Sequence, residues 1–240
     1  MVADESNYGW NGRFERLHFK VAWTVVPAGR AVIQARQPEP DRARFKIKAC
    51  TNQALDVFHK VRDKILARTR LTGDGLRAHS YRIIRREGDD REKKALRFGD
   101  GGLVHTKDLR TGKTDYFPVE SATVDVLTAL YATRRRALED GQKIRIPVFD
   151  DEQSYDLVVD VVGRERLDTV FGEDTPTVKV RPRLKTDGVF SRKGKLWVWF
   201  TDDRRHIPVR MESEIAIGSV TARLTALHRA AGQDKPGACR

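Results

Sequence analysis

The stretch LHFKVAWTV at residues 17–25 decides the fold class of this chain. Its apolar side chains alternate with polar or small ones, and the apolar set is Leu17, Phe19, Val21, Trp23 and Val25. A period of two residues places every second side chain on the same face of a β-strand. The stretch therefore predicts a strand that buries one face.

The same alternation recurs along most of the chain, and short turns containing Gly, Asp or Pro separate the segments. The further expected strands cover residues 30–35, 44–49, 61–70, 76–87, 93–98, 103–107, 142–149, 154–165, 177–185, 195–201, 206–214 and 217–227. Strands joined by short turns, without a helix after each strand, are typical of antiparallel sheets. The sequence predicts roughly a dozen strands in a single antiparallel sheet.

One segment breaks the alternation. From Ser121 to Leu138, apolar residues recur at helical spacing, and Ser121 is a suitable N-cap. Arg134, Arg135 and Arg136 would lie in the last turn, where cations interact favourably with the helix dipole. This is the one main helix that the sequence predicts, beside one or two helical turns within residues 52–60.

The run KLWVWF at residues 195–200 is apolar on both faces. A strand of this kind must be covered on both sides. A rolled or closed sheet would cover one face, and the helix could serve as a lid over the sheet or as a plug inside it. We therefore expect a single, highly curved antiparallel sheet (rolled, spiral or half-barrel) with the helix packed against it or inside it.

The chain length of 240 residues fits one sizeable domain. We expect that domain at residues 13–227, an N-terminal extension at 1–12 and a flexible tail at 228–240. The chain contains no run of about 18 apolar residues, so the sequence predicts no transmembrane helix.

The chain is basic, with 46 Lys and Arg against 34 Asp and Glu and a formal net charge of +12. Many cations take every second place in expected strands, as in RFKIK at residues 44–48, which favours a solvated outer face. A functional basic face for an anionic partner is the alternative. The cations that we consider as anion-facing are Arg134, Arg135, Arg181 and Arg183.

No catalytic motif is present, and the six histidines are dispersed. Asp202 and Asp203 near His206 are interpreted as a polar turn between strands. We therefore expect no catalytic residue, no metal site and no cofactor, and we do not expect an enzyme.

Trp197 and Trp199 could line a ligand cavity or belong to the core, because indoles supply much apolar area and an N–H donor. The candidate ligand-binding residues are Trp23, Phe45, Leu127, Tyr131, Trp197 and Trp199.

The two cysteines, Cys50 and Cys239, leave two alternatives open. They could close one long disulfide loop. We favour unpaired cysteines, because Cys239 lies in a tail that contains Gly and Pro and is expected to fray.

The C-terminal part of the chain contains GKLWVWFTDD at 194–203, IPVRME at 207–212 and GSV at 218–220. These segments resemble a bacterial family of exported proteins known only as domain-of-unknown-function family 3108. Shorter segments agree in order, namely AGRA at 28–31, KVRD at 60–63, DVLTALY at 125–131, VGRE at 162–165 and VRPRL at 180–184.

The resemblance implies a periplasmic protein that is normally made with a signal peptide, although Met1–Asn7 lacks a signal-peptide pattern. It also implies a sheet like that of periplasmic lipoprotein carriers. Our leading hypothesis is a cell-envelope protein that binds or carries a lipid-like or other hydrophobic ligand, peripheral at most to the membrane, with its cationic face toward anionic headgroups. The alternatives are a scaffold that binds an envelope protein and a binder of an acidic glycan. Nucleic acid is not an expected partner of a periplasmic protein.

Overall fold

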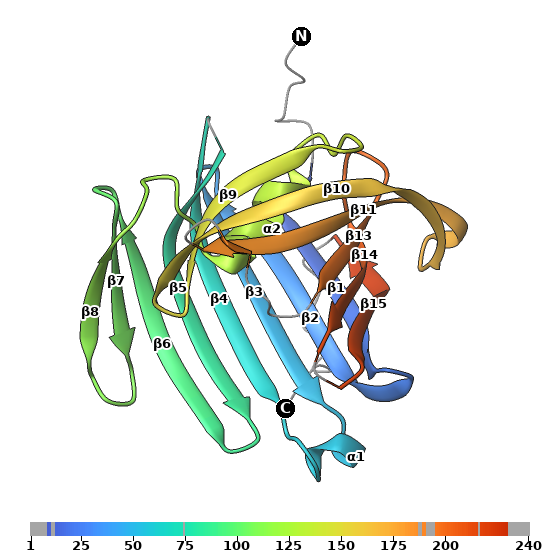
Figure 1. Ribbon diagram of the computed structural model, residues 1–240, viewed down its shortest axis with the longest axis horizontal. Helices are drawn as coiled ribbons and strands as arrows, with labels where there is room; N and C mark the ends of the chain where they lie inside the picture. Colours follow the sequence, from blue (N-terminus) through green and yellow to red (C-terminus); the bar gives the residue numbers. More distant parts are fainter. Residues whose placement is uncertain are drawn as a thin grey trace.

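The computed structural model describes residues 9–10, 13–73, 75–186, 189–190, 195–215 and 217–229 (Figure 1). Its strands are β1 (Phe14–Trp23), β2 (Val26–Glu39), β3 (Arg42–Thr51), β4 (Arg62–Thr72), β5 (Gly75–Glu87), β6 (Asp90–Gly99), β7 (Leu103–Asp108), β8 (Thr114–Pro118), β9 (Lys143–Asp150), β10 (Gln153–Thr169), β11 (Gly172–Thr186), β12 (Val189–Phe190), β13 (Leu196–Thr201), β14 (Pro208–Glu214) and β15 (Ser219–His228). Its helices are α1 (Gln53–Asp56) and α2 (Val126–Arg134). Neither helix, within this part of the chain, is long and apolar enough to cross a membrane.

All the strands belong to one sheet, in the order β8-β7-β6-β5-β4-β3-β2-β1-β15-β14-β13-β11-β10-β9, with β12 paired to β11 off this path. Neighbouring strands are antiparallel throughout. The path ends at β8 on one side and β9 on the other, so the sheet is open. This confirms the predicted fold class, a curved antiparallel sheet with one main helix.

Helix α2 lies between the two halves of the sheet, with β9–β11 on one side and β2–β5 on the other (Figure 1). The first hydrophobic cluster joins Leu127 and Tyr131 of α2 to the inner side chains of β1–β7, such as Phe45. The second joins Ala129 to the inner side chains of β9–β13, such as Val180. The helix is therefore a plug within the curved sheet.

Helix α2 is shorter than the sequence indicated. It begins after Asp125, whose carboxylate accepts from the backbone N–H of Thr128 at 2.8 Å and from its hydroxyl at 2.7 Å. Ser121 is not the N-cap, because Val124 is held as a β-bridge to Val148 at the edge of β9. The expected helical segment after Arg134 is irregular.

The predicted two-sided strand is β13. Val198 and Phe200 belong to the second cluster, with Ala129 of α2, while Trp199 belongs to the first cluster. Both faces are therefore covered, as the apolar run requires. The alternation at residues 17–25 is confirmed only as far as Phe19, since Thr24 and Val25 form the turn into β2 and Trp23 is exposed.

Two strands, β8 and β12, were not predicted. Both are short members of the sheet, and β8 lies at its edge. The two sheet halves also meet through side chains, because Lys94 of β6 forms an ion pair with Glu152 in the β9–β10 turn at 3.1 Å.

Candidate ligand cavity

A cavity of about 550 Å³ lies between α2 and the concave face of the sheet. Three walls enclose it. Helix α2 contributes Leu127 and Leu130, β11 and β13 contribute Val180 and Val198, and β3 and β4 contribute Ile47 and Ile65. The volume falls within the range of small-molecule sites, roughly 300–1,000 Å³.

The alternation of the strands explains the apolar lining. Ile47 and Ile65 are direct cross-strand partners on the inner face, and Val180 and Val198 form a second such pair. Directly paired residues in an antiparallel sheet share a face. The helix residue Leu130 touches both hydrophobic clusters and is only partly buried, so α2 leaves space beside itself.

Polar groups border the cavity without filling it. The polar lining residues are Thr133, Asp150 and Ser213 and the cations Arg181, Arg183 and Lys195. Burial raises the pKa of the Asp150 carboxyl above its usual range. A raised pKa lowers the negative charge of Asp150, so the charged groups that border the cavity are mainly the three cations, which suit an occupant with an apolar body and an acidic end.

Of the six candidate ligand-binding residues, the structure places Leu127 in the cavity wall. Phe45 and Tyr131 stack in parallel with ring centroids 3.9 Å apart, and Trp10 meets both rings edge-on at 5.8 and 6.1 Å. This aromatic group packs on the inner face next to the cavity and does not line it.

The three candidate tryptophans lie elsewhere. Trp23 is 39% exposed at the end of β1, and its indole N–H donates to the carbonyl of Ile217 at 2.8 Å. Trp197 and Trp199 project from the face of β13 opposite to Val198 and do not line the cavity. Of the two alternatives for the indoles of β13, the structure favours a place in the core over one in the wall of this cavity.

Trp199 is a buried structural residue. Its ring lies between the cations of Lys179 and Arg210, each 4.7 Å from the ring centroid, and its indole N–H donates to Glu165. Lys179 and Arg210 are its cross-strand partners on β11 and β14. The long stems of these two cations cover the outer face of the indole.

Arg134 does not face an anionic ligand, contrary to expectation. Its guanidinium forms two hydrogen bonds with the Glu15 carboxylate, at 2.7 and 3.0 Å, and its side chain is only 1% exposed. It also donates to the carbonyls of Arg205 and His206. Arg134 therefore points from the last turn of α2 into the protein, whereas the sequence indicated that this turn is exposed at the surface.

The other anion candidates are partly buried. Arg183 pairs with Asp160 at 2.5 and 2.9 Å. Arg181 is the neighbour of Asp160 across the β10–β11 ladder, and both arginines line the cavity beside α2 together with Val180 and Leu184. Arg135 caps the C-terminus of α2. Arg181 and Arg183 therefore belong to one site, the cavity beside α2, whereas Arg135 does not line it.

His206 and Asp203 form the expected polar turn. Asp203 accepts from Thr201 and Arg205. The ring of His206 lies 2.9 Å from the carbonyl of Arg134, and burial lowers the pKa of this imidazole. The turn therefore fastens the end of α2 to β13 and β14.

Sequence reasoning missed most of the cavity. Ile47, Ile65, Leu130, Val180, Val198 and Met211 line it and were not among the candidates. Their signal was the inner-face alternation, which marks a buried face but does not distinguish a packed side chain from one that borders a cavity.

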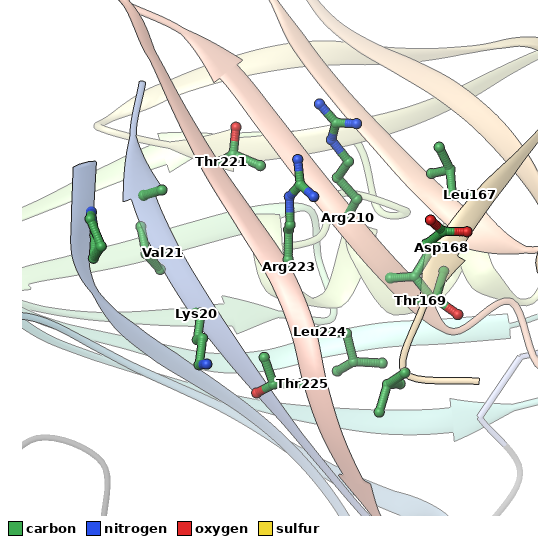
Figure 2. A pocket seen from close by; sticks show the side chains of 14 residues that line it. Lys20, Val21, Leu167, Asp168, Thr169, Arg210, Thr221, Arg223, Leu224 and Thr225 are labelled. Atoms are coloured by element: carbon green, nitrogen blue, oxygen red, sulfur yellow. The ribbon is translucent and has the colours of Figure 1, made fainter. Parts of the chain in front are cut away.

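A second pocket, of about 500 Å³, lies where the end of the β10–β11 hairpin meets β1, β14 and β15. Figure 2 shows Arg210 and Arg223 pointing the same way from neighbouring strands, with Asp168 and Thr169 across from them. Lys20 adds a third cation. This pocket is more polar in its side chains than the cavity beside α2.

Cys50 is disulfide-bonded in the structure, so the preference for an unpaired Cys50 was wrong. Cys239, the other cysteine of the sequence, lies outside the described residues.

The fold and the cavity together define a class, an open antiparallel sheet curved around a helix. The chain belongs to the family described as "Protein of unknown function (DUF3108)", whose model matches residues 18–225. The chain matches no curated protein.

Among solved structures, the chain resembles a β-barrel-like protein of family DUF1849 from Brucella abortus. The TM-score is 0.57 at 12% identity, over 91% of this chain and 98% of that chain. A weaker likeness, with a TM-score of 0.36 at 10% identity over 92% and 98% of the two chains, is to a Bacteroides fragilis protein inferred to be exported, with a YmcC-like fold. At such identities the first likeness shows the fold alone.

Proposed function

We propose that this protein is a non-enzymatic protein of the bacterial cell envelope that holds a lipid-like or other hydrophobic ligand in the cavity beside α2. The observation that carries the proposal is the cavity itself, about 550 Å³ in volume and walled mainly by aliphatic side chains. Covering such walls removes apolar surface from water, at about 25 cal/mol per Å².

The lining of the cavity supports a ligand with an apolar body and a polar end. Aliphatic residues line three sides, from α2, from β3–β4 and from β11–β13, while hydroxyl groups, a carboxyl group and the cations Arg181, Arg183 and Lys195 lie at the border. A ligand with an apolar body and a small polar end satisfies both regions.

The envelope location rests on two supports. The family resemblance of the sequence implies export. A disulfide at Cys50 suits an oxidising compartment such as the periplasm.

The test is titration with cis-parinaric acid, a fatty acid whose fluorescence rises in an apolar site. Leu130→Trp should fill space in the cavity and weaken binding about tenfold or more. The matched control is Val162→Trp, at a position that is 54% exposed and does not line the cavity. The control should bind within about twofold of the wild type.

Thermal unfolding of each variant shows whether it is folded. Saturable binding that only Leu130→Trp weakens supports the proposal. The absence of binding to the wild type, or equal binding by both variants, overturns it and favours the scaffold alternative.

A further inference from the structure

One end of the molecule carries a group of exposed apolar side chains, which we call the apolar tip. It consists of Trp23, Val25, Val26, Val57, Phe58, Ile215 and Ile217. They come from the β1–β2 turn, the segment after α1 and the β14–β15 turn. Val25, Phe58 and Ile217 are 86%, 85% and 74% exposed.

Hydrogen bonds hold the three turns side by side. The indole N–H of Trp23 donates to Ile217, and the backbone N–H of Thr24 donates to Ser219 at 2.7 Å. On the other side, the Asn52 side chain donates to the carbonyl of Pro27 at 2.5 Å. The β1–β2 turn is therefore joined to the β14–β15 turn on one side and to the start of α1 on the other, near the lower edge of the view in Figure 1.

Such exposure has no role in the stability of the protein. Large apolar side chains scattered over a surface are ordinary, but a contiguous group of them marks a contact surface. All seven side chains lie in turns or at the ends of strands, so they can enter a membrane without any rearrangement of the sheet.

A row of cations crosses the sheet behind the tip. Arg210, Arg223, Lys20 and Arg30 are directly paired in register across β14, β15, β1 and β2. We call these four residues the basic row. Figure 2 shows three of them, Lys20, Arg210 and Arg223.

The spacing between the tip and the row fits the depth of a membrane interface. Lys20 precedes Trp23 by three residues and Arg30 follows Val26 by four, and a strand rises about 3.3 Å per residue. The cations therefore stand roughly 10–13 Å behind the tip. Apolar groups of peripheral proteins enter a bilayer by about 5–10 Å, which would leave the row at the phosphate level.

We infer that the apolar tip and the basic row dock this protein onto the surface of an anionic lipid bilayer. The net charge of +12 is complementary to that surface. The apolar tip distinguishes a bilayer from a nucleic acid, which would need the cations alone. The inference does not depend on what the cavity holds.

The tip also lies close to the cavity. Lys195 and Ser213 line the cavity, and the backbone N–H of Glu214 donates to the carbonyl of Lys195 at 2.8 Å, one residue before Ile215. Docking would bring this end of the cavity toward the membrane.

The test is co-sedimentation with vesicles of phosphatidylcholine alone or with 30% phosphatidylglycerol. The wild type should bind the anionic vesicles, and added salt should weaken the binding. The double variant Phe58→Ser, Ile217→Ser should lower the partition coefficient about tenfold or more. Lys20→Gln with Arg223→Gln should lower it on anionic vesicles alone.

The matched control is Val162→Ser, which removes an exposed valine far from the tip along the sequence and should bind as the wild type does. A second measurement keeps the test independent of variant folding. Brominated lipids should quench the fluorescence of the wild type, and Trp23→Phe should remove most of that quenching.

Two results would overturn the inference. In the first, the wild type binds a DNA duplex as tightly as it binds vesicles, and the tip variant has the same affinity as the wild type for both. In the second, the wild type does not bind vesicles and is a dimer, whereas the tip variant is a monomer. That result would show that the tip contacts a second copy of the chain.

Discussion

Glu15 and Arg134 stand 119 residues apart and form a bidentate ion pair, with their side chains 3% and 1% exposed. The pair joins β1 to the last turn of α2. Because Arg134 also donates to the carbonyl of His206 at 2.8 Å, one guanidinium connects β1, α2 and the turn before β14. This connection holds the helix within the curved sheet, beside the cavity.

Breaking the Glu15–Arg134 pair should destabilise the protein strongly. Glu15→Gln leaves a buried guanidinium without its counter-charge, so the free energy of unfolding should fall by about 3–5 kcal/mol in urea denaturation. The matched control is Glu120→Gln, which breaks the exposed ion pair with Arg145 and should cost less than about 1 kcal/mol. Equal costs would contradict the role given to the buried pair.

The N-cap of α2 should make stability depend on pH. Burial raises the pKa of the Asp125 carboxyl to about 6, from an ordinary value of 3.8. The folded protein then binds the proton more tightly than the unfolded chain does. The contribution to stability is fully present below pH 4 and is lost as the pH rises through 6.

Asp125→Asn, which keeps a capping side chain, removes this dependence. The free energy of unfolding of the wild type relative to the variant should fall by up to about 3 kcal/mol between pH 4 and pH 7. Urea titrations of both proteins at four pH values measure it. A difference that rises with pH would show that the hydrogen bonds from Thr128 outweigh burial.

Trp199 should matter for stability and not for the ligand. Trp199→Ala removes a buried indole and should cost about 3–5 kcal/mol. Trp23→Ala, at an exposed position, should change stability by about 0.5 kcal/mol. Under conditions where Trp199→Ala is folded, its affinity for cis-parinaric acid should stay within about twofold of the wild type. A larger loss of affinity would show that Trp199 belongs to the binding site.

The pairing of β2 with β3 depends on a glycine. A Cβ at Gly29 would lie 2.0 Å from the carbonyl oxygen of Cys50, which is backbone and cannot move aside. Gly29→Ala should therefore lower the free energy of unfolding by about 1–3 kcal/mol. Gly101→Ala, where a Cβ meets nothing within 4 Å, serves as the control. A Gly29→Ala variant as stable as that control would place the two strands in a different register.

The fold followed from local pattern, and the cavity did not. Alternation along each strand identified the sheet, because a residue's face depends only on its own strand. The start of α2 was misplaced because Val124 pairs with Val148, a contact between distant segments that overrides helical periodicity. Arg134 resembled a surface cation for the same reason, since Glu15 lies far away in the sequence.

The cavity residues were not distinguishable from core residues. Val180 and Val198 alternate as the packed residues of β11 and β13 do. Whether they meet a side chain or a space depends on how far α2 stands from the sheet. That distance is set by the Arg134 contacts and by the Asp125 cap.

We propose above that the cavity beside α2 holds a hydrophobic ligand. Native mass spectrometry of the protein, produced in the periplasm and purified gently, tests this most directly when combined with lipid extraction of the same sample. We expect a stoichiometric adduct that releases a defined lipid-like molecule, and we expect Leu130→Trp to deplete it. A bare mass of 27.4 kDa for the wild type, with no extractable lipid, would contradict it.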